Sequence, residues 1–507
     1  MAHDSAIQKA TVLIMARTAN KVLKSSGFML LTRFLQKSLG LISTLVLARI
    51  LTPDDFGVVA FLALTISFFN VITVTGTFQY IISKESVDKD DLNTALTLDV
   101  LMKTGIWIIL IISTPYICIY FDMEEATSAL YVLSSVLIIK SFKNPGFILF
   151  QKDLNYSKFF KLETTSKFVS VAAVLAATYF SPTYWAIVIG DLVAAFVLTA
   201  GSYVLHSHRP TFTLRKIKEQ WGFSQWVLLK GIVGFSKANI DQIFVTKLFA
   251  AKDIGSFYMA KDIAMLPAYN LLNQATSPLL PTFAKSLADK DLFSYRVGFS
   301  CFFINVFALP IAAYMYLFSH QIIFLLLGEQ WSHINSMFIS FIPLMYLACF
   351  APILSHAIIA QRQVKRIFYT DVMSLLFLVA GFFLFNNLTL EMIIMIRVAT
   401  QLVVMAVLFL IVKSFSNISL IRLSILALPT LGSVFIAAFL IKPLVPTQFE
   451  IFSFFKLSAL FTLVLLSVHV AVYLLLKEKV KKTQEYMDFW SLFLPVILKL
   501  LPLKIAR

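Results

Sequence analysis

The sequence predicts an all-α polytopic membrane protein with about fourteen transmembrane helices. Hydrophobic residues make up 59% of the 507 residues and charged residues only 14%, and the mean hydropathy is +0.83. Soluble domains average about 25% charged residues, and a chain with 49 Phe against 27 acidic residues has too much apolar surface for water-soluble cores. This composition excludes most soluble enzymes and nucleic-acid-binding domains, so no nucleic-acid partner is expected.

Fourteen mostly apolar stretches are long enough to cross a membrane, which takes about 20 helical residues for roughly 30 Å of hydrocarbon. The apolar stretch 168–190 is divided into two spans because Ser181, Pro182 and Thr183 supply a turn signal in its middle. The predicted spans are 27–51, 56–83, 93–121, 126–150, 158–180, 183–206, 223–249, 254–283, 295–319, 334–360, 367–386, 390–412, 422–441 and 454–476.

The basic residues between these spans predict an orientation. Eight alternate segments, from 1–26 to 477–507, hold 28 Lys and Arg, whereas the seven segments between them hold only Lys252 and Lys442. Cytoplasmic loops carry such an excess of positive charge, so we expect both termini on the cytoplasmic side. Orientation and attraction to anionic membrane lipids also account for the net charge of +16.

An internal repeat appears at an offset of 198 residues, where Arg49 aligns with Lys247, Asp55 with Asp253 and Gly57 with Gly255. Both copies open a six-span unit, which predicts two lobes related by a pseudo-two-fold axis along the membrane normal. The predicted parts are a cytoplasmic N-terminus (1–26), an N-lobe (27–206), a cytoplasmic linker (207–222), a C-lobe (223–413), two extra helices (422–476) and a cytoplasmic interfacial tail (477–507).

The repeat also carries a family resemblance. Residues 48–60 read Ala-Arg-Ile-Leu-Thr-Pro-Asp-Asp-Phe-Gly-Val-Val-Ala, and the next span ends in Phe-Gln-Tyr-Ile-Ile-Ser-Lys at 78–84. Together with Asp-Ile-Gly-Ser-Phe-Tyr at 253–258 and Ser-Pro-Leu-Leu-Pro at 277–281, they resemble the polysaccharide transporter family. This family includes Wzx-type O-antigen flippases and belongs to the multidrug/oligosaccharidyl-lipid/polysaccharide exporter superfamily.

The resemblance implies a function and a location. It implies a multi-pass flippase of the bacterial inner membrane that moves undecaprenyl-diphosphate-linked oligosaccharides outward by alternating access. Such a transporter serves the biosynthesis of lipopolysaccharide O-antigen, capsule or exopolysaccharide, and its partners include the polymerase or ligase that receives the repeat unit.

Basic residues inside the spans are the candidate ligands of an anionic lipid diphosphate. Lys37 and Lys237 lie about 15–20 Å deep, where an uncompensated charge costs about 2.5–3.5 kcal/mol. The spacing predicts a basic and polar stripe on each of spans 1 and 7, lining a cavity where ammonium and guanidinium groups replace the hydration of the phosphates. The candidates are Arg33, Lys37, Lys230, Lys237 and Lys261.

Polar residues on spans 2 and 8 are the candidate sugar contacts: Asn70, Thr73, Thr77, Tyr258 and Asn273. A structural alternative stays open for some of the charges. Lys237 with Asp241, and Asp99 with Lys103, stand four residues apart and can form local ion pairs on one helix face. No partner can be named for Lys140, Lys167, Asp191 or Arg397.

Two features of the sequence bear on the energy source of transport. The chain has no P-loop, so ATP hydrolysis in the same chain is not expected. Proton or sodium antiport is the alternative, and Asp241 and Asp262 are the candidate carriers because intramembrane carboxylates commonly have this role. The three cysteines stand alone and the histidines do not cluster, so no metal and no cofactor are expected.

Two other functions stay open. A multidrug exporter, or an exporter of another lipid-linked precursor, shares the predicted fold. A polytopic glycosyltransferase or ligase would use lipid-linked sugars, with Asp54 and Asp55 as outer carboxylates. The short outer loops leave little room for an acceptor, and Asp253 in the second copy of the repeat indicates a helix-capping role. We therefore expect a transporter rather than an enzyme.

Overall fold

The computed structural model describes residues 28–29, 31–74, 76–84, 86–153, 155–276, 278–385, 387–446, 450–476 and 488, apart from the side chains of 83, 222–227, 229–230 and 472–476. The predicted N-terminal segment 1–26, and the predicted tail 477–507 except residue 488, lie outside this description. The chain divides into two compact units, Met1–Tyr258 and Met259–Arg507, which we call the N-unit and the C-unit. The predicted lobe boundary at the linker 207–222 stays a prediction.

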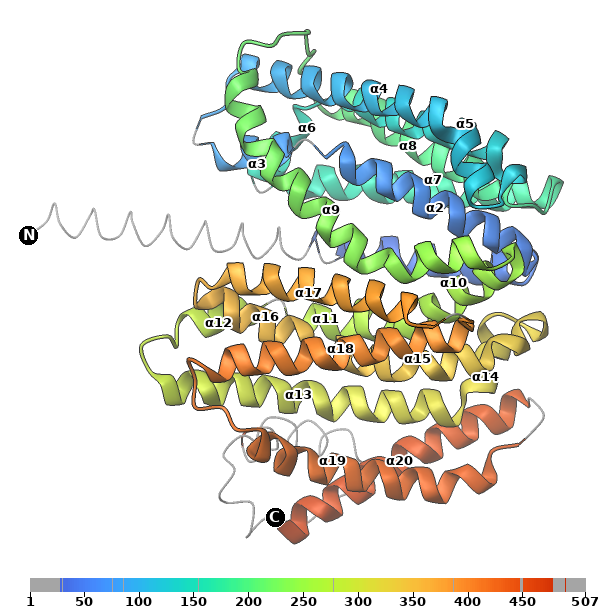
Figure 1. Ribbon diagram of the computed structural model, residues 1–507, viewed down its shortest axis with the longest axis vertical. Coiled ribbons are helices and arrows are strands. Elements are labelled where there is room, and N and C mark those ends of the chain that lie inside the picture. The colour runs from blue at the N-terminus through green and yellow to red at the C-terminus, as the bar shows by residue number, and fades with distance from the viewer. Residues whose placement is uncertain are drawn as a thin grey trace, which may run out of the picture. The chain divides into compact units, whose positions relative to one another are not determined.

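The N-unit is a bundle of helices in which α7 packs along α8, α4 along α5, and α2 along α9 (Figure 1). Its most buried candidate membrane span is α2, in which 56% of the 18-residue apolar window is buried inside the protein. The helices are one over residues 31–48, α2 (Pro53–Ile72), α3 (Thr77–Ser83), α4 (Lys89–Tyr120), α5 (Thr127–Ser141), α6 (Phe147–Lys152), α7 (Tyr156–Phe180), α8 (Trp185–Leu205), α9 (Ile217–Leu248) and the start of α10 (Ala251–Leu266).

Local sequence signals fix several helix ends of the N-unit. A capping box starts α2, in which the Thr52 side chain accepts from the Asp55 backbone and the Asp55 side chain accepts from the Thr52 backbone. The same device starts α4 with Asp88 and Asp91. The predicted hairpin near Pro182 is confirmed, because α7 ends at Phe180 and α8 begins at Trp185.

The C-unit is also helical in its described residues. The last two helices pair with each other and pack on α13 through buried apolar side chains that include Phe318, Ile441, Phe454 and Phe461. The helices are the rest of α10, a π-helical turn (Pro267–Leu272), α11 (Asn273–Ala275), α12 (Leu279–Ala284), α13 (Lys290–Leu317), α14 (Ser319–Leu326), α15 (Asn335–Ala348), α16 (Ala351–Ala360), α17 (Val364–Phe383), α18 (Leu390–Lys413), α19 (Leu420–Ile441) and α20 (Ile451–Leu476).

Among the described residues, nine helices are long and apolar enough to cross a membrane. The other five predicted spans correspond to the helix over 31–48 and to α5, α7, α9 and α10, which are shorter or carry more charge. Large apolar side chains such as Phe180 and Phe452 are more than four-fifths exposed, as expected for surfaces that face lipid. The all-α polytopic class is confirmed, and the count of fourteen spans stays a prediction.

The two copies of the repeat touch each other inside the N-unit. A Cβ added to Gly57 at the start of α2 would lie 1.9 Å from the carbonyl oxygen of Ala251. A Cβ added to Gly255 at the start of α10 would lie 2.0 Å from the carbonyl oxygen of Pro53. Because Pro53 and Ala251 are themselves 198 residues apart, the two contacts are equivalent and define a local pseudo-two-fold relation.

Candidate functional site

A cavity of about 480 Å³ lies in the N-unit beside a break in the second predicted span. The prediction of one helix over 56–83 is wrong, because α2 ends at Ile72 and α3 starts at Thr77. Gly76 allows this break, since its φ of 63° lies in the left-handed region that favours glycine. The polar lining residues are Asn70, Thr73, Thr77, Gln79, Asp99, Lys103, Lys140, Lys143, Asn144, Gln151 and Thr199, and the larger apolar ones are Val71, Val74, Phe78, Leu96, Phe147, Ile148, Phe159 and Leu198.

Three lysines face this cavity. Lys103 comes from α4, Lys140 from the last turn of α5, and Lys143 from the turn that follows the end of α5 at Ser141. A helix C-terminus carries partial negative charge and favours cations nearby. Asn144 holds the chain that follows Lys143, because its backbone N–H donates to Ser202 Oγ at 2.9 Å and its amide donates to the His208 carbonyl at 2.8 Å.

Carboxylates accompany these lysines. Lys103 Nζ lies 2.6 Å from Asp99 Oδ2, so the local pair that the spacing allows is formed. Lys143 Nζ lies 3.7 Å from Glu163 Oε1 of α7. The other oxygen of Glu163 accepts a hydrogen bond of 2.9 Å from Gln36 Nε2 of the first helix. The cavity therefore has a cationic wall whose charges are partly balanced by acids.

Lys167 of α7 and Asp191 of α8 add two further charges near these lysines. Asp191 attracts both Lys140 and Lys167 electrostatically, and Lys103 and Lys140 both repel Lys143. The Lys167 ammonium lies 3.6 Å from the Cβ position of Gly40 on the first helix. We call Asp99, Lys103, Lys140, Lys143, Glu163, Lys167 and Asp191 the N-unit charge cluster; it contains four lysines and three carboxylates.

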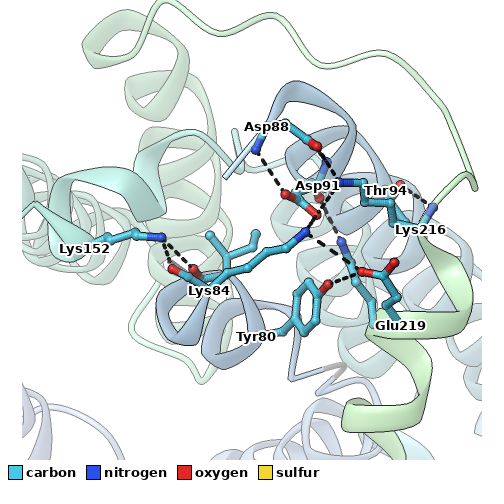
Figure 2. A network of polar contacts seen from close by, with 10 residues as sticks. Tyr80, Lys84, Asp88, Asp91, Thr94, Lys152, Lys216 and Glu219 are labelled. Atoms are coloured by element: carbon cyan, nitrogen blue, oxygen red, sulfur yellow. Dashed lines mark hydrogen bonds and ion pairs between the residues drawn. The ribbon is translucent and has the colours of Figure 1, made fainter. Parts of the chain in front are cut away.

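A second group of charges, the α3–α9 network, connects α3 to the starts of α4 and α9 and comprises Tyr80, Lys84, Asp88, Asp91, Lys216 and Glu219 (Figure 2). The Asp91 side chain is fully buried and pairs with Lys84 at 2.6 Å and with Lys216 at 3.4 Å. Lys216 also pairs with Asp88 and holds the pKa of that carboxyl down at about 2.

The same network holds α3 in place beside the cavity. Tyr80 Oη donates to Glu219 Oε2 at 2.7 Å, and Lys152 of α6 donates to the backbone carbonyls of Ile81 and Lys84 (Figure 2). Two residues of α3, Phe78 and Gln79, line the cavity. The network therefore holds one wall of the cavity in place.

Asp55, one of the two outer carboxylates that a glycosyltransferase or ligase would use, has a structural role. Asp55 Oδ2 accepts from the backbone N–H and the hydroxyl of Thr52, at 3.1 and 2.7 Å. Asp55 Oδ1 accepts from the backbone N–H of Tyr184 at 3.2 Å. Both oxygens of Asp55 thus fix the start of α2 and its connection to α8. No group of three metal-ligating side chains occurs among the residues the structure describes.

A family model described as polysaccharide biosynthesis protein matches residues 46–336, which is more than half of the chain. The chain belongs to this family. The matched region contains every residue of the cavity wall and the whole α3–α9 network.

Individual relatives are distant but cover most of the chain. An uncharacterized membrane protein in the cps region of Klebsiella pneumoniae is 22% identical over 65% of this chain and 68% of its own length. The lipopolysaccharide biosynthesis protein WzxC of Escherichia coli is 22% identical over 61% of this chain. The succinoglycan biosynthesis transport protein ExoT of Rhizobium meliloti is 20% identical over 62% of this chain. The matches span 63% of WzxC and 64% of ExoT, less than two thirds of either protein.

Solved structures share the fold of this family member. A structure of the lipid II flippase MurJ in an inward closed conformation matches with a TM-score of 0.72 at 15% identity, covering 90% of this chain and all of that one. An inward-facing multidrug resistance transporter of the MATE family matches with a TM-score of 0.57 at 13% identity, covering 77% of this chain and 95% of that one. These likenesses establish the fold.

The predicted sugar contacts of span 2 do lie together. Asn70, Thr73 and Thr77 all line the cavity, at the end of α2 and the start of α3. Tyr258 is half-buried at the end of the N-unit, and Asn273 is half-buried on α11 of the C-unit. Their proposed contacts with sugars stay predictions.

The predicted diphosphate ligands are more scattered. Arg33 and Lys37 are exposed on the helix over 31–48, and Lys237 is half-buried on α9. Lys261 is half-buried in the C-unit, and the Lys230 side chain lies outside the description. Of the candidate ion carriers, Asp241 is fully buried on α9 and Asp262 is exposed on α10.

The lysines that line the cavity of this family member are not among the predicted diphosphate ligands. Lys103 was assigned to a local pair, and Lys140 had no partner that could be named from the sequence. The charged neighbours of Lys140 and Lys143 come from α7 and α8, 20 or more residues away in the chain. The available signal is the spacing of Lys140 and Lys143, which stand three residues apart and would share a helix face within the predicted span 126–150, although α5 itself ends at Ser141.

Proposed function

We propose that this protein is a flippase for lipid-linked oligosaccharides and that the cavity of the N-unit receives the diphosphate of its substrate. The observation that carries this proposal is the set of three lysines, Lys103, Lys140 and Lys143, around one cavity inside the family-matched region. The proposed substrate is an undecaprenyl-diphosphate-linked repeat unit for O-antigen, capsule or exopolysaccharide. The names of WzxC and ExoT, which refer to lipopolysaccharide and succinoglycan biosynthesis, support this class.

The chemistry of the cavity suits both parts of such a lipid. Ammonium groups supply charge-assisted hydrogen bonds that replace the lost hydration of phosphate oxygens. Apolar side chains such as Val74, Phe78 and Phe159 offer a surface for the first isoprene units. Asn70 and Thr73 supply polar groups for the first sugar. Lysines inside a membrane protein are costly and commonly mark a substrate pathway, which favours this assignment.

The remaining predicted residues have a place in the same proposal. Arg33, Lys37, Lys230, Lys237 and Lys261 would guide the diphosphate on its path, and Tyr258 and Asn273 would contact sugars. Transport would proceed by alternating access, with substrate entering from the cytoplasmic side of the bacterial inner membrane. A proton or sodium gradient would drive it, with Asp241 or Asp262 as the carrier. A polymerase or ligase would take the product.

A multidrug exporter is the alternative within the same fold, and the MATE neighbour supports the fold for it. The cationic wall of the cavity disfavours it, since cationic drugs would be repelled by three lysines. A glycosyltransferase is disfavoured by Asp55, whose two carboxylate oxygens both accept hydrogen bonds within the protein.

Deletion of the gene in its native host tests the proposal. We expect the surface polysaccharide to be lost and lipid-linked repeat units to accumulate on the inner leaflet. The wild-type gene should restore the polysaccharide, whereas Lys103→Gln, Lys140→Gln and Lys143→Gln together should not. Repeat units that accumulate outside, unpolymerised or unligated, would contradict a flippase and support an enzyme.

A further inference from the structure

We propose that Asp99 and Glu163 are resident counter-ions that the diphosphate of the substrate displaces from Lys103 and Lys143. The inference rests on the proposed function and adds a role for the acids of the cavity wall. In the structure Lys103 is paired with Asp99 and Lys143 with Glu163. In the loaded protein the same lysines would bind phosphate oxygens instead.

The Asp99–Lys103 pair can open without a change in the backbone. The two residues are four apart on α4, both line the cavity, and their side chains are 28% and 16% exposed. A lysine has four rotatable side-chain bonds, so rotation alone moves its ammonium from the carboxylate to a ligand in the cavity. A fully enclosed pair could not exchange partners in this way.

The Lys143–Glu163 pair is the looser of the two. Its N–O distance is 3.7 Å, against 2.6 Å for Asp99 and Lys103. Glu163 also accepts a hydrogen bond of 2.9 Å from Gln36. When Lys143 turns to a ligand, Glu163 therefore keeps one hydrogen-bond partner on the helix over 31–48. We infer that Lys143 is the first lysine to change partners.

The charge balance of the cluster supports an exchange. Four lysines, at 103, 140, 143 and 167, stand against three carboxylates, at 99, 163 and 191, which leaves one net positive charge when the cavity is empty. A diphosphate that links a lipid to a sugar carries one negative charge on each phosphate, so the loaded cluster has one net negative charge. Without the acids the empty cluster would hold four uncompensated positive charges, which the membrane interior disfavours strongly. The acids thus let the protein reorient both with and without substrate.

Competition between carboxylate and phosphate has a measurable consequence. If Asp99 and Glu163 occupy the lysines that the substrate needs, their removal should tighten binding of a lipid diphosphate. A purely structural ion pair would behave in the opposite way, because its loss would disturb the position of the lysine and weaken binding.

The experiment measures the affinity of the full-length protein, in nanodiscs of uncharged lipid, for undecaprenyl diphosphate. Undecaprenol, which lacks the phosphates, is the control ligand. The variants are Asp99→Asn, Glu163→Gln, Lys143→Gln and the double variant Glu163→Gln/Lys143→Gln. Asp90→Asn is the matched control, because Asp90 lies on the same helix as Asp99 but pairs with the exposed Arg215. Thermal unfolding verifies that each variant is folded.

We expect Asp99→Asn and Glu163→Gln each to lower the Kd about three- to tenfold, the factor that a partly buried ion pair provides. Asp90→Asn should leave the Kd within about twofold, and undecaprenol binding should not respond. In the Lys143→Gln protein the further change Glu163→Gln should alter the Kd less than about twofold, since this carboxylate competes through Lys143.

Unchanged or weaker binding of undecaprenyl diphosphate by Glu163→Gln and Asp99→Asn would overturn the inference. It would also be overturned if Glu163→Gln raised the affinity equally in the wild-type protein and in the Lys143→Gln protein. The proposed function fails separately. If Lys103→Gln, Lys140→Gln and Lys143→Gln together bind undecaprenyl diphosphate as the wild type does, the cavity is not the diphosphate site and the inference fails with it. If that triple variant loses binding but the acid variants do not tighten it, the site stands and only the counter-ion role is overturned.

Discussion

Single residues in this protein are constrained by backbone contacts as much as by charge. Gly57 and Gly255 are the clearest cases, since a side chain at either position would collide with a backbone carbonyl of the other repeat. Backbone atoms cannot move aside as the end of a flexible side chain can. These two glycines therefore hold the starts of α2 and α10 at a separation that no other residue permits.

Substitution of either glycine by alanine should destabilise the protein. Overpacking of this kind costs roughly 1–3 kcal/mol, so Gly57→Ala and Gly255→Ala should each lower the melting temperature of the purified protein. Gly105→Ala on α4 is the matched control, because a Cβ there meets nothing within 4 Å. That control should be neutral or stabilising by about 0.5–1 kcal/mol, since alanine favours a helix. Equal melting temperatures for all three variants would contradict the close contact.

Among single residues, the sequence predicts the polar side chains of span 2 that line the cavity but not the lysines that line it. The repeat aligns Gly57 with Gly255, and the structure brings the two into equivalent contacts. Asn70, Thr73 and Thr77 were predicted to line a common site because of their spacing, and they do line one cavity. The sequence pairs Lys103 with Asp99 but gives no partner for Lys140 or Lys143, because Glu163 and Asp191 lie on other helices and periodicity reports only the face of one helix.

At the scale of elements, the α3–α9 network holds a short helix against two long ones. The seven residues of α3 are too few to form a stable helix alone. Buried contacts of Ile81 with Leu92 and Ala95 support it, and the ion pairs of Asp91 tie the connection that follows α3 to the starts of α4 and α9 (Figure 2). This wall of the cavity thus depends on one buried carboxylate.

Removal of that carboxylate should loosen α3. Asp91→Asn leaves Lys84 and Lys216 without their shared partner and weakens the capping box of α4. We expect a loss of roughly 1–3 kcal/mol in the free energy of unfolding, because both lysines are partly exposed and can turn to water. Denaturant titration measures this change. Asp90→Asn should cost under about 1 kcal/mol, because Asp90 pairs with an exposed arginine. An equal effect of the two substitutions would be evidence against the network.

The segment 206–213, which follows the end of α8, should become less firmly attached in mild acid. Burial lowers the pKa of His206 and of His208 below the usual value of 6.5, and nearby Lys158, Lys89 and Arg209 lower them further. A folded-state pKa below the unfolded value means that attachment of this segment is fully stable above about pH 6.5 and weakens as the pH falls. Hydrogen exchange of these amides, corrected for the intrinsic rate, should rise between pH 7.5 and 5.5. The variant His206→Gln/His208→Gln should lose this rise, and its persistence there would contradict the assignment.

Element boundaries show where prediction from sequence succeeds and fails. The turn at Ser181 to Thr183 was predicted because proline ends a helix, and it is present. The break between α2 and α3 was missed because the span is uncharged throughout and a single Gly76 is a weak signal. The sequence does not predict helix α14, because its eight residues are too few for a span and begin with the polar Ser319, His320 and Gln321.

At the scale of the whole molecule, the predicted orientation can be tested directly. All three native cysteines are buried, so single introduced cysteines can be labelled against a low background. A membrane-impermeant maleimide added to whole cells should label Glu124→Cys and Lys252→Cys, which lie in predicted outer loops. Lys89→Cys and Lys285→Cys, predicted to be cytoplasmic, should react only after the membrane is permeabilised. The reverse pattern would invert the proposed direction of transport.

Transport by the purified full-length protein in proteoliposomes tests whether this protein moves lipid-linked oligosaccharides with the help of the three cavity lysines. The measurement is the movement of an undecaprenyl-diphosphate-linked oligosaccharide between leaflets, detected by the access of a sugar-modifying enzyme added outside. We expect rapid movement with the wild-type protein. When Lys103, Lys140 and Lys143 are all replaced by Gln in a protein that still folds, we expect only the rate of protein-free vesicles. Movement at the wild-type rate in that variant, or none with the wild type, would contradict this expectation.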